Sequence, residues 1–590
     1  MFRGKCGLDA TSIRATTILP GARGGCHAVW QTRRMHRTPQ LSSHRLLHTR
    51  SMTTSAAPAA SPQPTTNRTP VAVGVALTAL SALMLVVMWP MFGGLWWLAP
   101  VAFVPMYVAQ YRLLPRKWSF APVAVAFGAY GFAVGMLGAS IAPMALILGG
   151  ALGIALLGAV IGVFQRPFSE RTRYRWFVLQ LPIVWLFIEV AIQDNEILGS
   201  TPWLAYRMGE VPQLVAPVSV TGTPALSFLV LVVNAAIALV LLRWLDASGR
   251  SGSAVPVPRS VLRGWAVGVL AVALVWAAAG VGITAQVRDS QGPAVRAAYV
   301  QPGLANVMPG VLVGGDDNDP RTAEQRRDDQ AAHLRDLTLA AAEQGAQLVV
   351  WPEEVLEYDP REERTQWIPD LVRQTGIYLV AGFTRDFSDA SQPNRALMWA
   401  PSGDIIGIYS KNKRVIMEGE SFTPGTEFPV LATALGPLGM VICFDLDFPN
   451  GPVRQVTDAG ARIVAAPSID FASVADLRTT STVFRAIENR VGIVKADLAW
   501  DSAVVGPDGQ VLAGTVITDD DGGVAVAVVD LPTGPGGAPF TSYGNMPVTV
   551  LSVALLIALV VAMVVAARRE RRNGGGVHSA RIREARPGQN

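Results

Sequence analysis

The stretch VAVGVALTALSALMLVVMW, residues 71–89, carries no charged side chain and is long enough for a helix to cross the ~30 Å hydrocarbon layer of a membrane. Seven further apolar runs of similar length follow: 95–111, 120–138, 144–164, 176–193, 224–242, 264–284 and 547–567. A single run also suits a buried helix of a soluble core, but seven in succession do not. Only 16% of the 590 residues are charged, against roughly 25% in typical soluble domains. We therefore predict eight membrane crossings.

The charged residues between these runs predict how the chain is oriented in the membrane. Lys and Arg gather after the second, fourth and sixth runs and after the last, at 112–117, 166–175, 243–263 and 568–590. The intervening loops are short and uncharged, or net acidic at 194–222. Cytoplasmic loops carry an excess of Lys and Arg. We therefore expect a multi-pass protein of the cytoplasmic membrane with both termini in the cytoplasm and residues 291–540 on the outer face.

The chain divides into five predicted segments. Residues 1–70 hold ten Lys/Arg against one acid, Asp9, and are expected to form a disordered basic tail without chemistry. A transit peptide has the same acid-poor look, and Met52 is an alternative start. A seven-helix membrane domain follows at 71–290, then an outer domain at 291–540. A last crossing at 547–567 and a basic cytoplasmic tail at 568–590 complete the chain.

The outer segment has the composition of a soluble domain with alternating strand and helix patterns. Strands are predicted at 294–301, 347–351, 377–383, 395–400, 405–410, 439–443, 461–466 and 492–497. Helical patterns are predicted at 321–344 and 483–491. This alternation is typical of a layered α/β domain, and about 240 residues suffice for a core of its own.

Cysteine and histidine are scarce in this chain. It has three cysteines and six histidines, but beyond residue 70 only Cys443, His333 and His578 remain. No Cys/His zinc site and no disulfide can be built within that region. Any Ser-His-Asp chemistry there would depend on His333. No motif indicates a metal, a nucleotide, another cofactor or nucleic acid as a partner.

Three polar residues follow apolar strands of the outer segment: Glu353, Lys411 and Cys443. A thiol is mostly protonated at neutral pH, so it needs a base, and an ammonium stabilises both a thiolate and an oxyanion. The set therefore suits covalent acyl transfer without histidine. Taken singly, each residue has a plainer interpretation: a core cysteine, a turn glutamate and a surface lysine.

Several motifs around these residues resemble those of a known protein family. VVWPEE (349–354), YSKNK (409–413), FTPGTEFPV (422–430), ICFDLDFP (442–449) and RAIENR (485–490) resemble the nitrilase, or carbon–nitrogen hydrolase, superfamily. The resemblance implies an α-β-β-α sandwich and a Glu-Lys-Cys triad of Glu353, Lys411 and Cys443. It also implies an essential second glutamate at Glu420, with Glu418 left open. Lys413 is a weaker candidate than Lys411, because the Tyr-x-Lys pattern points to Lys411.

The membrane segment narrows the resemblance to the apolipoprotein N-acyltransferases. The similar stretches are WLAPVAFVP (97–105), Glu189 in the fifth run, the Gly199, Pro202 and Trp203 pattern, and APVSVTGTPALSFLVLVVN (216–234). This family transfers an acyl chain from a phospholipid, through a cysteine thioester, to the N-terminal amine of a diacylglyceryl-cysteine lipoprotein. By resemblance, Glu353 is the general base, and Lys411 with the Phe444 backbone N–H holds the oxyanion. The stretch 199–224 is either a lateral entrance or an ordinary outer loop.

The sequence also departs from the acyltransferase pattern. Cys443-Phe444-Asp445 stands where that family has Cys-Tyr-Glu, and CFDLDFP is closer to hydrolytic amidases. A membrane-tethered amidase that hydrolyses a C–N bond is therefore the rival function. A third alternative is a non-catalytic membrane protein that binds lipoproteins. Acyl-chain preference, the lipoproteins served and the oligomeric state are not encoded in any motif.

Overall fold

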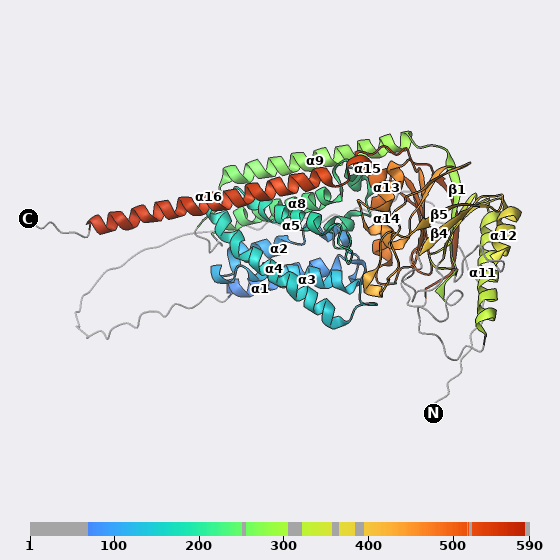
Figure 1. The fold of residues 1–590 in the computed structure, drawn as a ribbon. Coiled ribbons are helices and arrows are strands. Elements are labelled where there is room, and N and C mark those ends of the chain that lie inside the picture. The colour runs from blue at the N-terminus through green and yellow to red at the C-terminus, as the bar shows by residue number, and fades with distance from the viewer. Residues whose placement is uncertain are drawn as a thin grey trace, which may run out of the picture. The chain divides into compact units, whose positions relative to one another are not determined.

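The computed structural model describes residues 69–249, 255–304, 321–356, 365–383, 394–515, 517 and 522–584. The predicted tail 1–70 therefore lies almost wholly outside the described residues. The membrane part consists of helices α1 to α9, with α16 joining them from the C-terminal end (Figure 1). Their bounds are α1 Thr69–Val87, α2 Val104–Val108, α3 Ala121–Met136, α4 Met144–Arg171, α5 Phe177–Ile192, α6 Pro212–Val215, α7 Val218–Thr221, α8 Thr223–Ala247, α9 Arg259–Asp289 and α16 Met546–Glu584.

Within the described residues, six helical segments are long and apolar enough to cross a membrane. They are Pro70–Val87, Arg116–Met136, Met144–Arg171, Thr223–Ala247, Arg259–Asp289 and Met546–Arg572. The fifth predicted run forms a shorter apolar helix, Phe177–Ile192. The chain is thus an integral membrane protein by its helices, and the count of eight crossings stays a prediction.

The predicted continuous helix at 95–111 is wrong. This stretch forms a 3-10 turn at Trp96–Leu98, the five-residue α2 and a π-helical turn at Ala109–Leu113. Pro100 and Pro105 lie in it, and proline removes a backbone donor and clashes with the preceding helical turn. Asn234 of α8 stabilises the break, accepting from the Phe103 N–H at 2.9 Å and donating to the Ala99 carbonyl at 2.8 Å.

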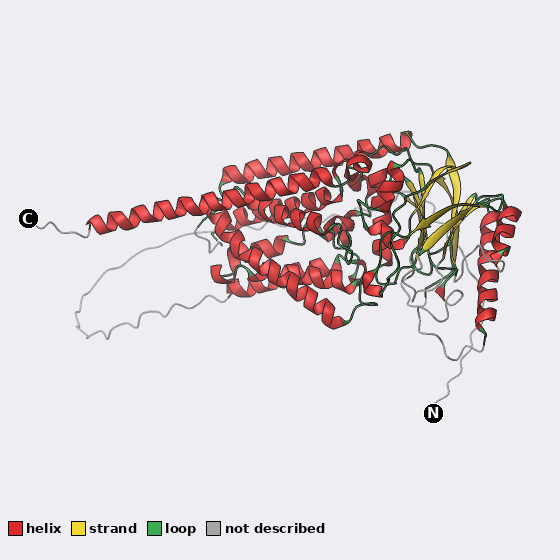
Figure 2. Cartoon of the chain, in the orientation of Figure 1, coloured by secondary structure: helices red, strands yellow, loops and turns green. Residues whose placement is uncertain are grey.

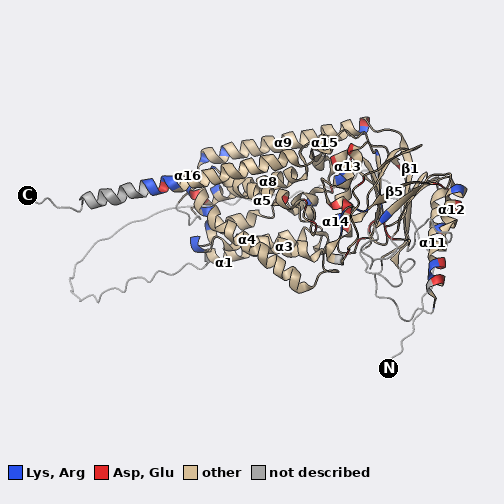
Figure 3. Ribbon diagram, viewed as in Figure 1, with Lys and Arg blue, Asp and Glu red and all other residues tan. Residues whose placement is uncertain are grey.

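The basic loops that we expected on one side of the membrane lie together. Figure 3 shows Lys and Arg gathered at the ends of the membrane helices that point away from the sheets. Arg112 forms a buried ion pair with Asp246 at the end of α8 (2.8 Å). Arg171 of α4 pairs with Glu570 of α16 at 2.6 Å. The loops rich in Lys and Arg, which alternate with uncharged loops in the sequence, therefore lie at the same end of the membrane helices.

The segment 291–540, which we predicted to lie outside the membrane, folds into two six-stranded sheets that pack face to face (Figure 2). One sheet has the order β12-β1-β2-β3-β4-β5 and the other β11-β10-β9-β8-β7-β6. The strands are β1 Ala294–Gln301, β2 Leu348–Val350, β3 Tyr378–Phe383, β4 Arg395–Trp399, β5 Ile405–Ser410, β6 Val430–Thr433, β7 Gly436–Met440, β8 Ile463–Ser468, β9 Gly492–Asp497, β10 Ala503–Val505, β11 Val511–Gly514 and β12 Ala525–Pro532.

Helices cover both outer faces of this pair of sheets. Helices α11 (Ala323–Glu343) and α12 (Trp367–Thr375) lie on the first sheet, and α13 (Pro452–Asp458) and α14 (Ala475–Asn489) on the second (Figure 1). The apolar core between the sheets includes Val350, Met398, Met440 and Ile463, all fully buried. These α-β-β-α layers are the fold class that the sequence resemblance implied.

Two local predictions were inaccurate. Strand β7 ends at Met440, so Cys443 does not end a strand but begins the 3-10 turn η8, Cys443–Asp447. Helix α14 begins at Ala475, eight residues before the predicted 483. The first half of α14 reads ADLRTTST, which has few apolar side chains. The spacing of apolar residues that is typical of a helix is weak in this half, because the half packs against the membrane domain as well as on a sheet.

The loop 194–222 ties the membrane helices to the sandwich. The N–H and hydroxyl of Ser200 both donate to the carbonyl of Asp447, at 2.9 and 2.5 Å. Gly199 has a φ of +50° and a Cβ there would lie 3.0 Å from the same carbonyl oxygen, so only glycine fits this approach without strain. Thr223, at the start of α8, donates to Glu488 of α14 at 2.5 Å. Turn η8, which begins with Cys443, is thereby held against the membrane domain.

Candidate active site

The three residues singled out in the sequence converge at one end of the two sheets. Glu353 follows β2, Lys411 follows β5 directly, and Cys443 follows β7. All three are at most 4% exposed. Cys443 has a φ of +45°, an uncommon conformation for a side chain other than glycine. Such strain is often found at functional sites, because the surrounding fold must hold it in place.

Lys411 lies between two carboxylates. Its Nζ donates to Oε1 of Glu353 at 2.8 Å and to Oε1 of Glu420 at 2.7 Å. Burial opposes its charge, but the carboxylates of Glu353 and Glu420 outweigh this and raise the pKa of Lys411 well above its usual value. Lys413 is placed elsewhere, with its ammonium 4.7 Å from the centre of the Phe448 ring. Lys411 is therefore the lysine that contacts Glu353.

Glu420 is held in this position from two sides. One carboxylate oxygen accepts from Lys411 and the other from the backbone N–H of Val415 at 2.5 Å. The side chain of Glu418, the alternative from the sequence, lies outside the described side chains. Among the described residues, Glu420 is thus the second carboxylate beside Lys411.

Glu353 accepts hydrogen bonds from several directions. Besides Lys411, Asn394 Nδ2 donates to Oε1 at 2.6 Å, and the backbone N–H of Ile469 donates to Oε2 at 3.2 Å. The negative charge of Glu353 also acts on the Cys443 thiol, whose pKa it helps to raise. Burial raises the pKa of Glu353 above its usual range, and the charge of Lys411 offsets this in part. A carboxylate placed in this way can accept the proton of a thiol.

The Cys443 thiol faces the loop after β8. Its Sγ lies 3.2 Å from the carbonyl oxygen of Ile469 and 3.9 Å from Oδ1 of Asp470. Burial, together with the negative charges of Glu353 and Asp470, raises the pKa of Cys443 well above that of a free thiol. The resting group is therefore a neutral thiol, which needs a base before it can act as a nucleophile.

Asp445 and Phe444, the other two residues singled out, shape the turn after Cys443. Asp445 accepts from the N–H groups of Ile442 and Lys413 and from the Tyr409 hydroxyl, at 2.9, 2.8 and 2.7 Å. It thereby connects η8 to the strand end that carries Lys411. Burial raises the pKa of Asp445 to about 6. The Phe444 ring packs edge-on against Phe448.

Two polar residues at the site had escaped the sequence analysis. Asn394, at the start of β4, donates through the same amide nitrogen to Glu353 and, at 3.0 Å, to Glu354. Asp470, near the Cys443 thiol, pairs with buried Lys495 at 2.7 Å. Neither belongs to a recognisable motif. The only signal was position, since both flank apolar strands at the edge that carries the triad.

Among the described residues, two clusters of three acidic side chains have carboxylate oxygens close enough together to hold a cation. They are Glu353 with Glu354 and Glu420, and Asp470 with Asp497 and Asp501. Each contains a buried lysine ammonium: Lys411 in the first, and Lys495, which contacts Asp501 at 2.6 Å, in the second. These ammonium groups balance part of the negative charge of the carboxylates. The arrangement is that of two buried ion-pair networks.

Both parts of the chain are similar to known protein families. The carbon–nitrogen hydrolase family model matches residues 318–534, which contain the whole candidate triad. The model of the apolipoprotein N-acyltransferase N-terminal domain matches residues 81–236 of the membrane part. The chain belongs to the apolipoprotein N-acyltransferase family. It is an integral membrane member of that acyltransferase family, with a carbon–nitrogen hydrolase domain.

Relatives of both parts are known. An apolipoprotein N-acyltransferase of Geobacter metallireducens is 25% identical over 425 residues, which cover 67% of this chain and 75% of the relative. A nitrilase of Pyrococcus abyssi is 31% identical over 220 residues, 33% of this chain and 81% of the relative. A solved structure of the amidase from Nesterenkonia sp. AN1 is 22% identical, with a TM-score of 0.35, and the match covers 43% of this chain and 97% of the amidase.

Proposed function

We propose that the protein moves an acyl chain from a membrane phospholipid to the N-terminal amine of a diacylglyceryl-cysteine lipoprotein. The observation that carries this proposal is a buried thiol, Cys443, beside a carboxylate and an ammonium, in a domain attached to membrane helices of this family. Both substrates are lipids of the bilayer, so a site held against the membrane domain receives them without extracting them into water. Exclusion of water also protects a thioester from hydrolysis.

In the first half-reaction, Glu353 takes the thiol proton and Cys443 Sγ attacks the sn-1 ester carbonyl. The S–C bond forms, the ester C–O bond breaks, and Glu353 passes the proton to the leaving glycerol oxygen, which gives a lysophospholipid. Lys411 and the backbone N–H of Phe444 stabilise the oxyanion between these steps. The raised pKa of Glu353 makes its carboxylate a stronger base toward the Cys443 thiol, whose own pKa is also raised.

In the second half-reaction, the lipoprotein amine attacks the thioester. The N–C bond forms, the S–C bond breaks, and the amine proton travels through Glu353 to the departing thiolate. Glu420 holds Lys411 in place during both steps, and Asp445 fixes the turn that carries Cys443. No step requires a metal or another cofactor. We place the site on the outer face of the cytoplasmic membrane, because the basic loops gather at the opposite ends of the helices.

A membrane-tethered amidase remains the second candidate. The 31% identity to a nitrilase exceeds the 25% identity to an acyltransferase, and CFDLDFP is the amidase-like motif. The same triad would serve it, with water instead of an amine as the second nucleophile. The two functions therefore differ in the acceptor and not in the first covalent step.

One experiment separates these functions. The full-length protein in mixed micelles receives a phospholipid with an isotope-labelled sn-1 chain, together with a synthetic diacylglyceryl lipopeptide. We expect labelled N-acylated lipopeptide and an equal amount of lysophospholipid. Labelled free fatty acid without N-acylated lipopeptide would contradict acyl transfer, as would ammonia release from amides without use of the lipid. Binding of the lipopeptide without turnover would identify a non-catalytic protein.

Replacing Asn394 with alanine tests how the base is tuned. The Asn394 amide donates to the Glu353 carboxylate and so favours its charged form, which means that losing the amide raises the pKa of Glu353 further. Protonated Glu353 cannot accept the thiol proton, so activity falls as the pH drops through this pKa. We expect the acid limb of the pH–rate profile for thioester formation to move to higher pH. The rate should fall about tenfold on that limb and less at high pH.

The control for this variant is Gln347→Ala, which removes an amide from the edge of the sandwich, where it contacts the Arg296 backbone. Its pH profile should match that of the wild type. An equal loss of Asn394→Ala at every pH, without movement of the limb, would mean that Asn394 has only a structural role.

Replacing Lys411 with methionine is expected to act on both rate and stability. It removes a proposed oxyanion donor, which typically costs about 10²- to 10³-fold in rate. It also leaves the Glu353 and Glu420 carboxylates buried without their partner, which lowers the free energy of unfolding by about 3–5 kcal/mol. Thioester formation and thermal unfolding measure the two effects. The matched variant Lys413→Met should change neither strongly, and equal behaviour of the two variants would refute the assignment of Lys411.

A further inference from the structure

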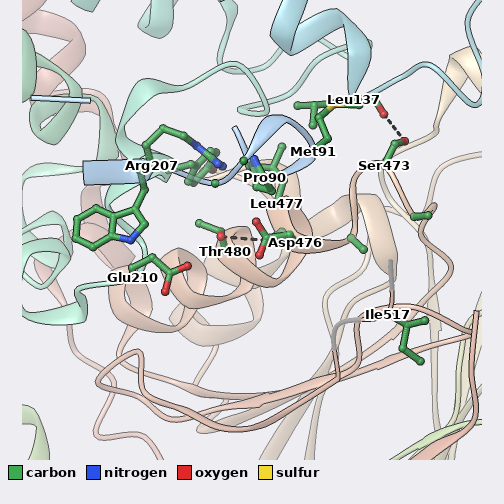
Figure 4. Close-up of a pocket in the computed structure, with 16 residues that line it drawn as sticks. Pro90, Met91, Leu137, Arg207, Glu210, Ser473, Asp476, Leu477, Thr480 and Ile517 are labelled. Carbon is green, nitrogen blue, oxygen red and sulfur yellow. Dashed lines mark hydrogen bonds between the residues drawn. The ribbon is translucent and has the colours of Figure 1, made fainter. Parts of the chain in front are cut away.

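A cavity of about 660 Å³ lies between the membrane domain and α14. Its walls come from the segment around Pro90 to Trp96, from the loop at Tyr206 to Glu210, and from residues 472–480 (Figure 4). Cys443, Glu353 and Lys411 are not among the residues that line it. The cavity is nevertheless close to them, because Asp470, near the Cys443 thiol, precedes Ser473 in its wall by three residues, at most about 11 Å of chain.

Arg207 brings an unpaired positive charge to this cavity. The residue is only 4% exposed, and its Nε and Nη2 are buried without a hydrogen-bond partner among the described residues. The guanidinium stacks on the Trp89 ring, with its central carbon 4.4 Å from the ring centre, and Figure 4 shows it extending toward Pro90. A buried guanidinium without a partner is costly for the fold. A ligand in the cavity that accepts from these nitrogens would lower that cost.

The turn that carries Arg207 is fixed by three side chains of the membrane helices. Glu189 of α5 accepts from the Leu204 N–H at 3.0 Å, and Ser227 of α8 accepts from the Ala205 N–H at 2.9 Å. The Tyr130 hydroxyl of α3 donates to the Pro202 carbonyl at 2.6 Å. The buried carboxylate of Glu189, noticed in the sequence, thus positions the turn η5, Leu204–Met208. The direction of Arg207 is set before any ligand arrives.

The other charges of the cavity are two carboxylates, Asp476 of α14 and Glu210. Both carboxylates attract the Arg207 guanidinium, but no ion pair joins either of them to it in the described structure, and Glu210 is exposed. The remaining wall is largely apolar, with Met91, Leu137 and Leu477 among its residues. A fixed guanidinium with two unbonded nitrogens beside apolar walls suits an anionic group that is attached to a hydrocarbon body, since a planar guanidinium pairs with phosphate oxygens through two parallel hydrogen bonds.

We propose that Arg207 binds the phosphodiester of the phospholipid acyl donor and so aligns its sn-1 ester with Cys443. This proposal rests on the proposed function for the identity of the ligand as an acyl donor. A few covalent bonds of glycerol separate the phosphate from the ester, which fits the short path between the cavity wall and the Cys443 loop. Arg207 is a donor-specificity residue in this scheme and takes no part in the proton transfers.

The test compares two acyl donors that differ only in the headgroup. Full-length protein in mixed micelles receives phosphatidylethanolamine or the diacylglycerol with the same chains, and acylation of Cys443 is followed by intact mass. In Arg207→Met the ratio of the phospholipid rate to the diacylglycerol rate should fall about 10- to 150-fold, the range for a charge-assisted hydrogen bond. In Arg207→Lys, which keeps the charge but not the planar guanidinium, this ratio should fall less.

Arg296→Gln, which removes a surface guanidinium at the far edge of the sandwich, is the control and should keep the wild-type ratio. An unchanged ratio in Arg207→Met would overturn the proposal, and so would an equal loss with both donors, which indicates a structural role. A raised KM for the lipopeptide with an unchanged donor ratio would assign Arg207 to the acceptor instead. Thermal unfolding should not fall in Arg207→Met, because the variant removes an unsatisfied buried cation.

A second readout keeps this proposal separate from the catalytic one. A phospholipid with a photoreactive headgroup is crosslinked to the full-length Cys443→Ala variant, which cannot turn over. Crosslinks are expected in the cavity segments around Met91 and Leu477, and Arg207→Met in the same background should remove most of them. Soluble glycerophosphoethanolamine at equal concentration should compete poorly; efficient competition would identify a site for free phosphodiesters and contradict a lipid site. If the wild type forms no thioester from either donor, the proposed function is wrong. The crosslinking result would still show whether Arg207 binds the phospholipid headgroup.

Discussion

Acylation of the protein and transfer to a lipopeptide are both expected to fall by about 10⁴-fold or more when Cys443 is replaced by alanine. The reason is that the thiol is the only group at the site, among the described residues, that can form a thioester with the donor. The fold should be nearly unaffected, because a small buried side chain is exchanged for one of similar size and polarity. Intact mass of the protein after incubation with labelled phospholipid, and thermal unfolding, measure the two effects.

The chain offers its own control for this variant. Cys6 and Cys26 are the other two cysteines, and the double variant Cys6→Ala/Cys26→Ala should keep wild-type acylation. Cys443→Ser retains the shape but places a far less acidic hydroxyl at the same strained position, so it should remain close to the alanine variant. Wild-type turnover in Cys443→Ala would show that the reaction does not pass through this residue.

Replacing Glu353 with glutamine is expected to slow acylation by about 10²- to 10⁴-fold, the range for loss of a general base. The amide preserves the shape of the side chain and Lys411 keeps Glu420 as its partner, so the fold should remain intact. Because the raised pKa of the thiol makes proton removal necessary, the remaining activity of Glu353→Gln should rise with pH as hydroxide replaces the base. Single-turnover rates between pH 6 and 9 test this.

Glu354 provides the matched variant, since its carboxylate is adjacent and also accepts from Asn394. Glu354→Gln should lose about tenfold or less and keep the wild-type pH profile. If Glu354→Gln and Glu353→Gln were equally slow, with the same pH dependence, the base could not be assigned to Glu353 alone.

The sequence predicted the features that depend on short stretches of residues. Strand β1 spans the predicted residues 294–301, and the Glu353, Lys411 and Glu420 side chains meet as the family pattern implied. It did not predict the broken segment at 95–111, because an apolar composition suits lipid or protein surroundings equally and the capping by Asn234 comes from a distant helix. Asn394 and Asp470 were missed for the same reason. Their roles arise only when strands remote in sequence lie side by side.

Arg207 illustrates a different limit of the sequence. In the sequence it is one positive charge in the net acidic loop 194–222, and no motif singles it out. Its burial depends on the turn that Glu189, Ser227 and Tyr130 fix from three separate helices. The contact of Gly199 and Ser200 with the Asp447 carbonyl then brings this loop against the α-β-β-α sandwich. A cavity between two domains is therefore a property of their packing and not of either segment alone.

The central claim is that an acyl chain rests on Cys443 between two lipid substrates. The most direct measurement is a pulse–chase on the wild-type protein, with a phospholipid carrying a labelled sn-1 chain followed by a diacylglyceryl lipopeptide. We predict a labelled thioester on the Cys443 peptide that is sensitive to hydroxylamine and that decays as labelled N-acyl lipopeptide appears in equal amount. Decay into free fatty acid alone, or label on any residue other than Cys443, would contradict this account.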